Sequence, residues 1–398
     1  MTRLNTDILI SGGGVAGLCA AAAFGSAGFD VICVEPNAPI TDAAGPGADL
    51  RTTALLQPAV AVLRAAGLWE RLAPNACALQ IMRIVDAGGV DAVARMTKDF
   101  DAADLSDQPF GWNLPNWLLR REMLARLAEL PNVTFMPGVA TTKLIPRDAQ
   151  ALVSLSNGRS VAARLVVAAD GRESTMRTAA GIGVKTTQYG QKAITFAVTH
   201  PLPHDNISTE IHRTGGPFTL VPLPDRSGLP CSAVVWMEPG PEAMRLAALP
   251  VPEFEAAINT RSCHVLGPLT LASGRMVWPI ISQIADRMAG GRVALMAEAA
   301  HVVPPIGAQG LNMSLTDLAV LLELAQGDRT GLGGHVMLDA YHRRRHTDIR
   351  VRVMGIDALN RASMAQTQGM RDLRAGALSA LYGAIPLRKA VMKMGLGV

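Results

Sequence analysis

The sequence predicts an α/β protein in which a Rossmann-like domain carries an inserted, mostly antiparallel β domain and is followed by C-terminal helices. Three observations predict this class: a glycine-rich turn between two apolar runs near the N-terminus, short β-rich runs separated by Pro and Gly in the middle, and helical patterns at the end. We expect four segments: a nucleotide-binding domain over residues 1–184, a β-rich substrate domain over 185–280, a return to the first domain over 281–335, and a helical region over 336–398.

The glycine-rich turn has the spacing of a dinucleotide site. Residues 8–10 form a short apolar strand, and Gly12 permits the tight turn that leaves it. Gly14 lets the backbone approach a pyrophosphate, and Gly17 lets the next helix pack against the sheet. The order of strand, turn and helix is what makes this motif specific.

The helix expected over residues 15–27 begins with Val15 and Ala16. Its N-terminus presents free N–H groups and the positive pole of the helix dipole to phosphates. Residues 31–34 then form a second strand, and Glu35 at its end can accept hydrogen bonds from a ribose diol. The alternative is an ordinary glycine-rich connection between a strand and a helix.

The remaining elements follow from local patterns. We expect strands over residues 81–94, 133–136, 151–155 and 160–169, and helices over 116–129, 308–325 and 337–365. Asn157-Gly158 predicts a tight hairpin between two of these strands, and Gly88-Gly89 a turn within the first of them.

The composition limits the class of protein. Of 398 residues, 49% are hydrophobic and 18% charged, which favours a large interior, an apolar ligand cavity or contact with a membrane. No apolar run is long enough to span a bilayer, and the N-terminus has no signal-peptide pattern, so we expect a cytoplasmic protein. The five scattered cysteines form no C-x-x-C pair and predict neither disulfides nor a metal site. A net charge of +4 without a basic stripe argues against nucleic-acid binding.

The C-terminal residues 385–394 combine apolar side chains with Arg388, Lys389 and Lys393. Such a basic, Met-rich amphipathic segment can bind a membrane surface or a partner protein. The alternative is a final helix packed on the body of the protein.

Two later motifs complete an ordered set with the glycine-rich turn. The first is Asp170-Gly171 within DGRESTMR, and the second runs from Ala297 to Asn312 as AEAAHVVPPIGAQGLN. The set resembles the FAD-dependent aromatic hydroxylases with the para-hydroxybenzoate hydroxylase fold. Asp49-x-Arg51-Thr52-Thr53 makes it most similar to the ubiquinone-biosynthesis hydroxylases. The resemblance covers essentially the whole chain.

The resemblance implies which residues bind FAD. They are Gly12, Gly14, Val15, Ala16, Gly17, Glu35, Arg51, Asn116, Asp170, Glu298, Gly310, Leu311 and Asn312. Arg51 is alternatively a surface arginine and Asn116 alternatively a helix cap. Pro304 and Pro305 would form a wall between flavin and substrate. No residue is assigned a catalytic role, and His301 is taken as a core histidine.

One position departs from the family pattern. The family usually has Gly-Asp where this chain has Ala297-Glu298. Glu298 still accepts hydrogen bonds from the ribityl chain, but it is one methylene longer, so the local backbone or the ribityl chain must adjust.

The resemblance implies an NAD(P)H- and O₂-dependent monooxygenase that acts through a flavin C4a-hydroperoxide, with FAD bound and NAD(P)H visiting transiently. Its expected substrate is a polyprenylated phenol of ubiquinone biosynthesis, reached at the inner face of the membrane or through other proteins of that pathway. Two alternatives stay open: a hydroxylase of a small soluble aromatic acid, and a non-catalytic accessory or lipid-carrier protein of the same fold.

Overall fold

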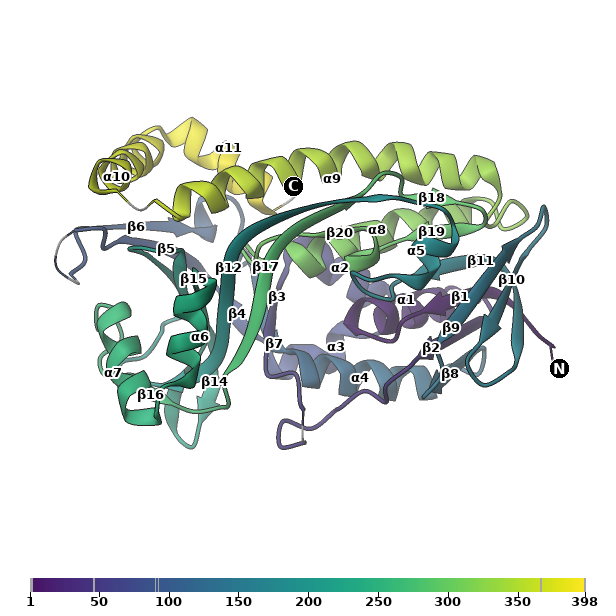
Figure 1. Ribbon diagram of the computed structural model, residues 1–398, viewed down its shortest axis with the longest axis horizontal. Helices are drawn as coiled ribbons and strands as arrows, with labels where there is room; N and C mark the ends of the chain where they lie inside the picture. The colour runs from purple at the N-terminus through teal and green to yellow at the C-terminus, as the bar shows by residue number, and fades with distance from the viewer. Residues whose placement is uncertain (1–2, 46, 90, 92, 366, 397–398) are drawn as a thin grey trace.

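The computed structural model describes residues 3–45, 47–89, 91, 93–365 and 367–396. The ends of the first and last predicted segments, residues 1–2 and 397–398, lie outside the described residues. Two large β-sheets stand side by side, and a long helix runs along both of them (Figure 1). The predicted α/β class, with a Rossmann-like domain, a mostly antiparallel second sheet and C-terminal helices, is confirmed.

The first sheet has a parallel centre in the order β19-β11-β1-β2-β8. Its strands are β1 (Arg3–Ser11), β2 (Val31–Glu35), β8 (Val133–Pro137), β9 (Thr141–Pro146), β10 (Ala151–Leu155), β11 (Ser160–Ala168), β18 (Ala289–Gly290) and β19 (Val293–Leu295). The central strands are apolar and almost fully buried, as is usual for strands of a parallel sheet. β10 and β11 pair antiparallel, as the Asn157-Gly158 turn predicts.

The second sheet forms the other half of the molecule and contains a single parallel pair, β13 with β5. In spatial order its strands are β20 (His301–Val302), β17 (Met276–Ala285), β12 (Val184–Thr199), β15 (Leu229–Pro239), β14 (Pro217–Arg226), β13 (Ile207–His212), β5 (Ile81–Asp86) and β6 (Met96–Asp101), with β16 (Thr270–Leu271) beside β12. Three strands, β5, β6 and β20, therefore come from outside residues 185–280.

The strand expected over residues 81–94 is shorter than predicted. β5 ends at Asp86 and β6 begins at Met96, and residues 90 and 92 of the predicted run lie outside the described residues. Gly88-Gly89 lies in the connection between the antiparallel strands β5 and β6, so the turn predicted at this pair is confirmed.

A small third sheet joins the two halves. It consists of β3 (Thr52–Leu56), β7 (Gly111–Pro115) and β4 (Cys77–Leu79), in the order β3-β7-β4. The helices of this half are α1 (Val15–Ser26), α2 (Gln57–Ala65), α3 (Trp69–Leu72), α4 (Asn116–Ala128) and α5 (Thr175–Ala179), with short 3₁₀ turns at Ala73–Asn75, Ala102–Asp104 and Ala297–Ala299. α1 is buried almost throughout and packs between the first sheet and α4.

The second sheet has two different faces. Alternate side chains such as Phe218, Leu220 and Trp236 pack under α6 (Gly240–Ala248) and α7 (Val251–Arg261) in one hydrophobic cluster. The opposite face points toward the first domain and lines a cavity.

Four helices complete the chain. They are α8 (Gln309–Gly327), α9 (His335–Ser363), α10 (Gln368–Gly383) and α11 (Ile385–Leu396). α9 runs along the top of the molecule in Figure 1, and α10 and α11 fold back at the end of the second sheet. Within the part of the chain that the structure describes, no helix is long and apolar enough to cross a membrane.

Ala297 adopts a left-handed backbone conformation, with φ of 54°, at a buried position. Left-handed φ values favour glycine because a Cβ atom crowds the backbone there. The glycine that the family usually has at this position therefore matches a constraint that the fold retains.

We predict that Ala297→Gly raises the free energy of unfolding by about 1 kcal/mol, because glycine removes the strain of the left-handed conformation. Denaturant unfolding measures the change. Ala299→Gly is the matched control: Ala299 is buried in the same turn without a positive φ, so this substitution should destabilise the protein. Equal destabilisation by both variants would contradict the prediction.

Candidate active site

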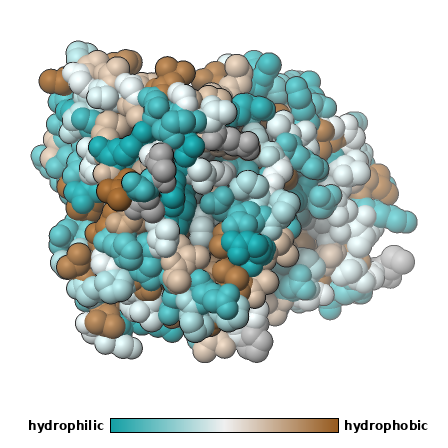
Figure 2. Space-filling view, turned by 60° about the vertical axis from the view of Figure 1, so that its left-hand side comes forward, coloured by the Kyte–Doolittle hydropathy of each residue, from teal (hydrophilic) through white to brown (hydrophobic). Residues whose placement is uncertain are grey.

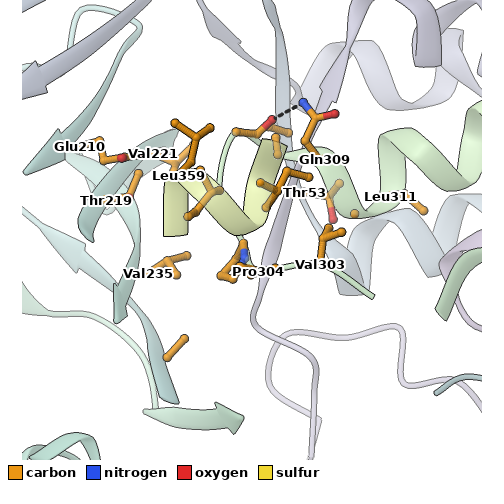
Figure 3. A pocket seen from close by; sticks show the side chains of 18 of the residues that line it. Thr53, Glu210, Thr219, Val221, Val235, Val303, Pro304, Gln309, Leu311 and Leu359 are labelled. Carbon is orange, nitrogen blue, oxygen red and sulfur yellow. Dashed lines mark hydrogen bonds between the residues drawn. The ribbon is translucent and has the colours of Figure 1, made fainter. Parts of the chain in front are cut away.

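One cavity of about 1350 Å³ connects the glycine-rich turn to the C-terminal helices. Its walls come from α1, β3, the cavity face of the second sheet, the segment before α8, and α9 to α11. Figure 3 shows Glu210, Thr219 and Val235 on the side of the second sheet and Thr53 and Leu311 on the other side, with Pro304 between them.

The glycine-rich turn is shaped by close backbone contacts. Gly12 has a φ of 102°, and a Cβ atom there would collide with the carbonyl group of Ala169. A Cβ atom at Gly17 would collide with the carbonyl group of Gly12. At Gly14, by contrast, a Cβ atom would meet no protein atom within 4 Å, so this residue faces open space. The three glycines therefore differ in function as the motif predicts: two permit packing, and one leaves room for a ligand.

The N-terminus of α1 is open to the cavity. Gly14 is its N-cap and supplies no side-chain hydrogen bond, and the cavity is lined by Gly14, Val15, Ala16 and Gly17. Uncapped N–H groups and a positive helix pole form a site for an anion such as a pyrophosphate. This cradle fits the pyrophosphate of FAD.

Glu35 lies under the turn rather than on the cavity wall. Its carboxylate accepts hydrogen bonds from the N–H groups of Gly13 at 2.6 Å and Asn37 at 3.2 Å. The carboxylate thus holds the turn to the end of β2, and its contact with a ribose stays a prediction.

Asp170 and Asn312 support the cavity without lining it. Asp170 accepts hydrogen bonds from Ser174 Oγ at 2.5 Å and Met176 N–H at 3.1 Å, which fixes the start of α5. Asn312 accepts from Leu56 N–H at 2.8 Å and donates to the carbonyl of Ala54 at 2.7 Å. Its amide therefore attaches α8 to β3, and the predicted FAD contact of each residue remains untested.

Asp49 is the centre of a polar cluster on the cavity wall. Its buried carboxylate accepts hydrogen bonds from Arg51 at 2.8 Å, Asn116 at 3.0 Å and Arg120 at 3.2 Å. Burial by itself raises the pKa of Asp49, but the hydrogen bonds and charges of Arg51, Asn116 and Arg120 outweigh burial and lower that pKa. Asp49 is therefore ionised and holds two arginines at the cavity.

The contacts of Arg51 and Asn116 are not those of a surface arginine and a helix cap, which were the two alternative interpretations. The Arg51 guanidinium lies 4.2 Å from the ring centroid of Trp278 in the second sheet, so this arginine bridges the two halves of the site. Asn116 begins α4 but does not cap it. Its side-chain nitrogen donates a hydrogen bond to Asp49, and its side-chain oxygen accepts one from Thr53 Oγ1 at 2.8 Å.

Glu298 lines the cavity beside Arg172, with 3.5 Å between the carboxylate and the guanidinium. Its side chain is half exposed, so the carboxylate has space to adjust to a ligand. The longer side chain is compatible with the predicted position beside a ribityl chain.

The segment from Val303 to Ala308 forms the wall between the two ends of the cavity. Pro304 and Pro305 line it, and Ala308 turns the chain into α8 with a φ of 56° and no side-chain cap. Gly310 and Leu311 on the first turn of α8 also line the cavity, so a second open helix N-terminus faces it. A flavin ring gains from such an end when negative charge develops on it.

His301 is buried and also lines the cavity next to this wall. Its Nε2 lies 2.7 Å from the carboxylate of Asp317, which also pairs with Arg345 at 2.8 Å. This fully buried network joins β20, α8 and α9 and is consistent with a core histidine.

Sequence reasoning missed Asp49, Arg120 and Trp278 as site residues. Arg120 follows Asn116 by four residues, so both lie on one face of α4, and that spacing was a usable signal. The sequence carries no such signal for Trp278, because no local pattern indicates which strand of the second sheet faces Arg51.

The described residues include no group of three or more His, Cys, Asp or Glu side chains that could hold a metal ion. Cys19 and Cys33 are fully buried, and burial raises the pKa of the Cys19 thiol to about 12. Both therefore remain protonated core residues.

A Rossmann-like domain with an open helix N-terminus, sharing one apolar cavity with a second sheet, defines a flavin-dependent monooxygenase of the aromatic hydroxylase class. The chain belongs to the FAD binding domain family, whose model matches residues 5–354. It is therefore an FAD-dependent aromatic monooxygenase, and NAD(P)H is the typical reductant of this family.

Relatives along the whole chain agree with this family. The chain is 33% identical to a protein of Rhodospirillum rubrum named ubiquinone hydroxylase UbiL, over 98% of this chain and 89% of the relative. It is 26% identical to the 3-demethoxyubiquinol 3-hydroxylase of Escherichia coli over the full length of both. The crystal structure of a p-nitrophenol 4-monooxygenase from Pseudomonas putida has the same fold, with a TM-score of 0.79 at 19% identity over 100% of this chain and 99% of that one.

We predict that Gly14→Val abolishes FAD binding while the protein stays folded. The Cβ atom of the valine would meet no protein atom within 4 Å, so the side chain would project into the open space beside the N-terminus of α1. Flavin released from the purified protein measures occupancy. Gly274→Val is the matched control, because Gly274 is exposed, has no positive φ and lies away from the cavity. Glu298→Asp should also retain FAD. Full occupancy in Gly14→Val would contradict the assignment of this turn.

Proposed function

We propose that this chain hydroxylates the aromatic ring of a polyprenylated phenol in ubiquinone biosynthesis, with NAD(P)H and O₂ as co-substrates. The names of the relatives place them in that pathway. The observation that carries the proposal is the shape of the cavity, which is long, mostly apolar, and continuous from the predicted flavin site to the C-terminal helices.

FAD, when bound, supplies the activation of O₂. The first turn of α1 would hold its pyrophosphate and the first turn of α8 would face its ring, with Arg51 and Glu298 alongside. Pro304 and Pro305 exclude water from the space beside the ring. The second sheet closes the other side with small and branched side chains such as Ala193, Val221 and Val235. These residues orient the substrate and keep the site dry.

The far end of the cavity supports a lipid-like tail. Here apolar side chains of α9, α10, α11 and β5 form the wall. Several of these side chains line the cavity and are also exposed to solvent. They are Val351, Leu359, Met370, Leu373 and Met394, each more than half exposed. We call this set the cavity mouth. A tail that leaves through the mouth would exchange water for apolar contacts along its length.

A small aromatic acid fits this cavity less well. Such a substrate needs a cation for its carboxylate, but the cavity-lining arginines each already pair with a carboxylate of the protein. The pairs are Arg51 and Arg120 with Asp49, Arg172 with Glu298, Arg352 with Asp348, and Arg374 with Asp86. Each of these five arginines therefore already has a carboxylate partner, and Arg51 and Arg120 share one.

We predict that kcat/KM increases at least tenfold when one prenyl unit is added to an otherwise identical phenol. Each buried methylene contributes about 0.8 kcal/mol, and about 1.4 kcal/mol corresponds to a tenfold change, so partial burial of five carbons suffices. Product formation by mass, across phenols that differ only in tail length, tests this. Equal kcat/KM for para-hydroxybenzoate and the prenylated phenol would contradict the proposed role in ubiquinone biosynthesis.

We also propose that the cavity mouth contacts an anionic membrane surface. Residues 367–396 contain five basic residues and one acidic one, a formal charge of +4. Lys389 and Lys393 lie on α11 next to the mouth. Figure 2 shows hydrophobic side chains along the upper edge of this end of the molecule, interspersed with hydrophilic ones. Apolar contact and basic charge together are the combination that binds anionic lipid.

The prediction is that the protein sediments with phosphatidylglycerol vesicles but not with phosphatidylcholine vesicles. Lys389→Gln combined with Lys393→Gln should weaken the interaction about thirtyfold, since each basic residue contributes about 1 kcal/mol near such a surface. Leu373→Ser should weaken it as well. Val336→Ser is the control, because Val336 is 70% exposed at the opposite end of α9. Equal binding by all variants would show that the mouth is not the contact.

A further inference from the structure

Glu210 differs from every other carboxylate on the cavity wall. Four of the five wall carboxylates pair with an arginine: Asp49 with Arg51 at 2.8 Å, Asp86 with Arg95 at 2.6 Å, Asp348 with Arg345 at 2.6 Å, and Glu298 with Arg172 at 3.5 Å. Among the described residues, Glu210 has no arginine or lysine within ion-pair distance, and its one titratable partner is His212.

The two side chains form a fixed pair on the second sheet. They stand two residues apart on β13, so both project from the cavity face, whereas Ile211 between them packs under α6 and α7. His212 Nε2 lies 2.7 Å from Glu210 Oε1, and the two side chains are 14% and 11% exposed. The other ring nitrogen, His212 Nδ1, is buried without a hydrogen-bond partner among the described residues. The two groups make one contact with each other, and His212 Nδ1 and the second carboxylate oxygen of Glu210 offer further hydrogen-bonding capacity.

The surroundings of the pair are mostly apolar. On β14, Thr219 stands opposite Glu210 and carries no charge; on β5, Ile84 stands opposite Glu210 and Asp86 opposite His212. Asp86 is neutralised by Arg95 and by Arg374 of α10. Figure 3 shows Glu210 on the sheet side of the cavity, across from Pro304. Apart from its contact with His212, the Glu210 carboxylate has no hydrogen-bond partner among the described residues, and a carboxylate in an apolar wall is stabilised by a further donor.

We propose that Glu210 and His212 form the subsite that binds the ring hydroxyl group of the substrate and accepts its proton. This inference rests on the proposed function, because a polyprenylated phenol has one kind of donor, the hydroxyl group on its ring. Glu210 contacts that hydroxyl and is the catalytic residue. His212 acts through Glu210 and is a positioning residue, which holds the carboxylate toward the cavity and shares the charge.

The proton transfer activates the ring. The O–H bond breaks, its electron pair stays on the ring oxygen, and the proton bonds to the Glu210–His212 pair. No electron leaves the substrate in this step. The negative oxygen raises the electron density of the ring carbons, which is what an electrophilic oxygen-transfer reaction requires. The subsite also gives specificity, since a ring methyl ether in place of the hydroxyl has no proton to donate.

A chromogenic phenol tests the subsite without turnover. A 4-nitrophenol with a hexyl chain on its ring has distinct absorption spectra as neutral phenol and as phenolate. We expect the wild-type holoenzyme to bind this probe as the phenolate at a pH where the free probe is mainly neutral, and Glu210→Gln to bind it as the neutral phenol. A neutral probe in the wild type overturns the proposal, and this result does not depend on whether any variant folds.

Turnover provides the second test. Glu210→Gln should lower kcat for a prenylated phenol about a hundredfold, the usual contribution of general-base catalysis, while KM rises no more than about tenfold. Glu210→Asp should restore part of kcat. Glu242→Gln, the same change on the exposed surface of α6, is the control. Unchanged kcat in Glu210→Gln overturns the proposal. Failure of the proposed function would differ from this, because the wild type itself would then not turn over any prenylated phenol.

Discussion

The close approach of Gly12, Gly17 and Ala169 is the contact on which the rest of the site depends. It brings the backbone of the turn against the end of β11, and so fixes the direction in which α1 points. Since the open N-terminus of α1 faces the cavity, the predicted pyrophosphate position is set by this contact. Glu35 supports the same turn from below through the N–H of Gly13.

The second sheet can line the cavity because its two faces differ. One face is sealed by α6 and α7, and the other must face the first domain, where it leaves an apolar wall with few polar groups. Arg51 over Trp278, and Arg374 bound to Asp86, attach this sheet to the nucleotide-binding half and to α10. The proposed sites for the cofactor, the substrate and the lipid contact therefore share one connected cavity.

Local signals were sufficient to predict much of the fold. The glycine spacing, the Asn157-Gly158 turn and the periodicity of α4, α8 and α9 each depend on residues close in the chain, and the structure has these elements near the predicted bounds. Pairing between distant segments could not be predicted. β5 joins β13 more than 120 residues later, and Arg374 reaches Asp86 over 288 positions. No local pattern encodes either contact.

The same limit applies to the site. Gly14, Arg51, Glu298 and Pro304 carry motif signals, and the structure brings them to one cavity. Glu210 and His212 carry none, because alternation along β13 shows that they share a face but not which face lines the cavity. Only the placement of α6 and α7 decides that.

The central claim is that one cavity holds FAD at one end and a tailed phenol at the other. A crystal structure of the protein with FAD and a prenylated phenol tests it directly. The account predicts the aromatic ring between Pro304 and the second sheet, its hydroxyl group at Glu210, and the tail leaving between α9 and α10. A ring bound outside this cavity, or a tail that leaves by another route, would contradict it.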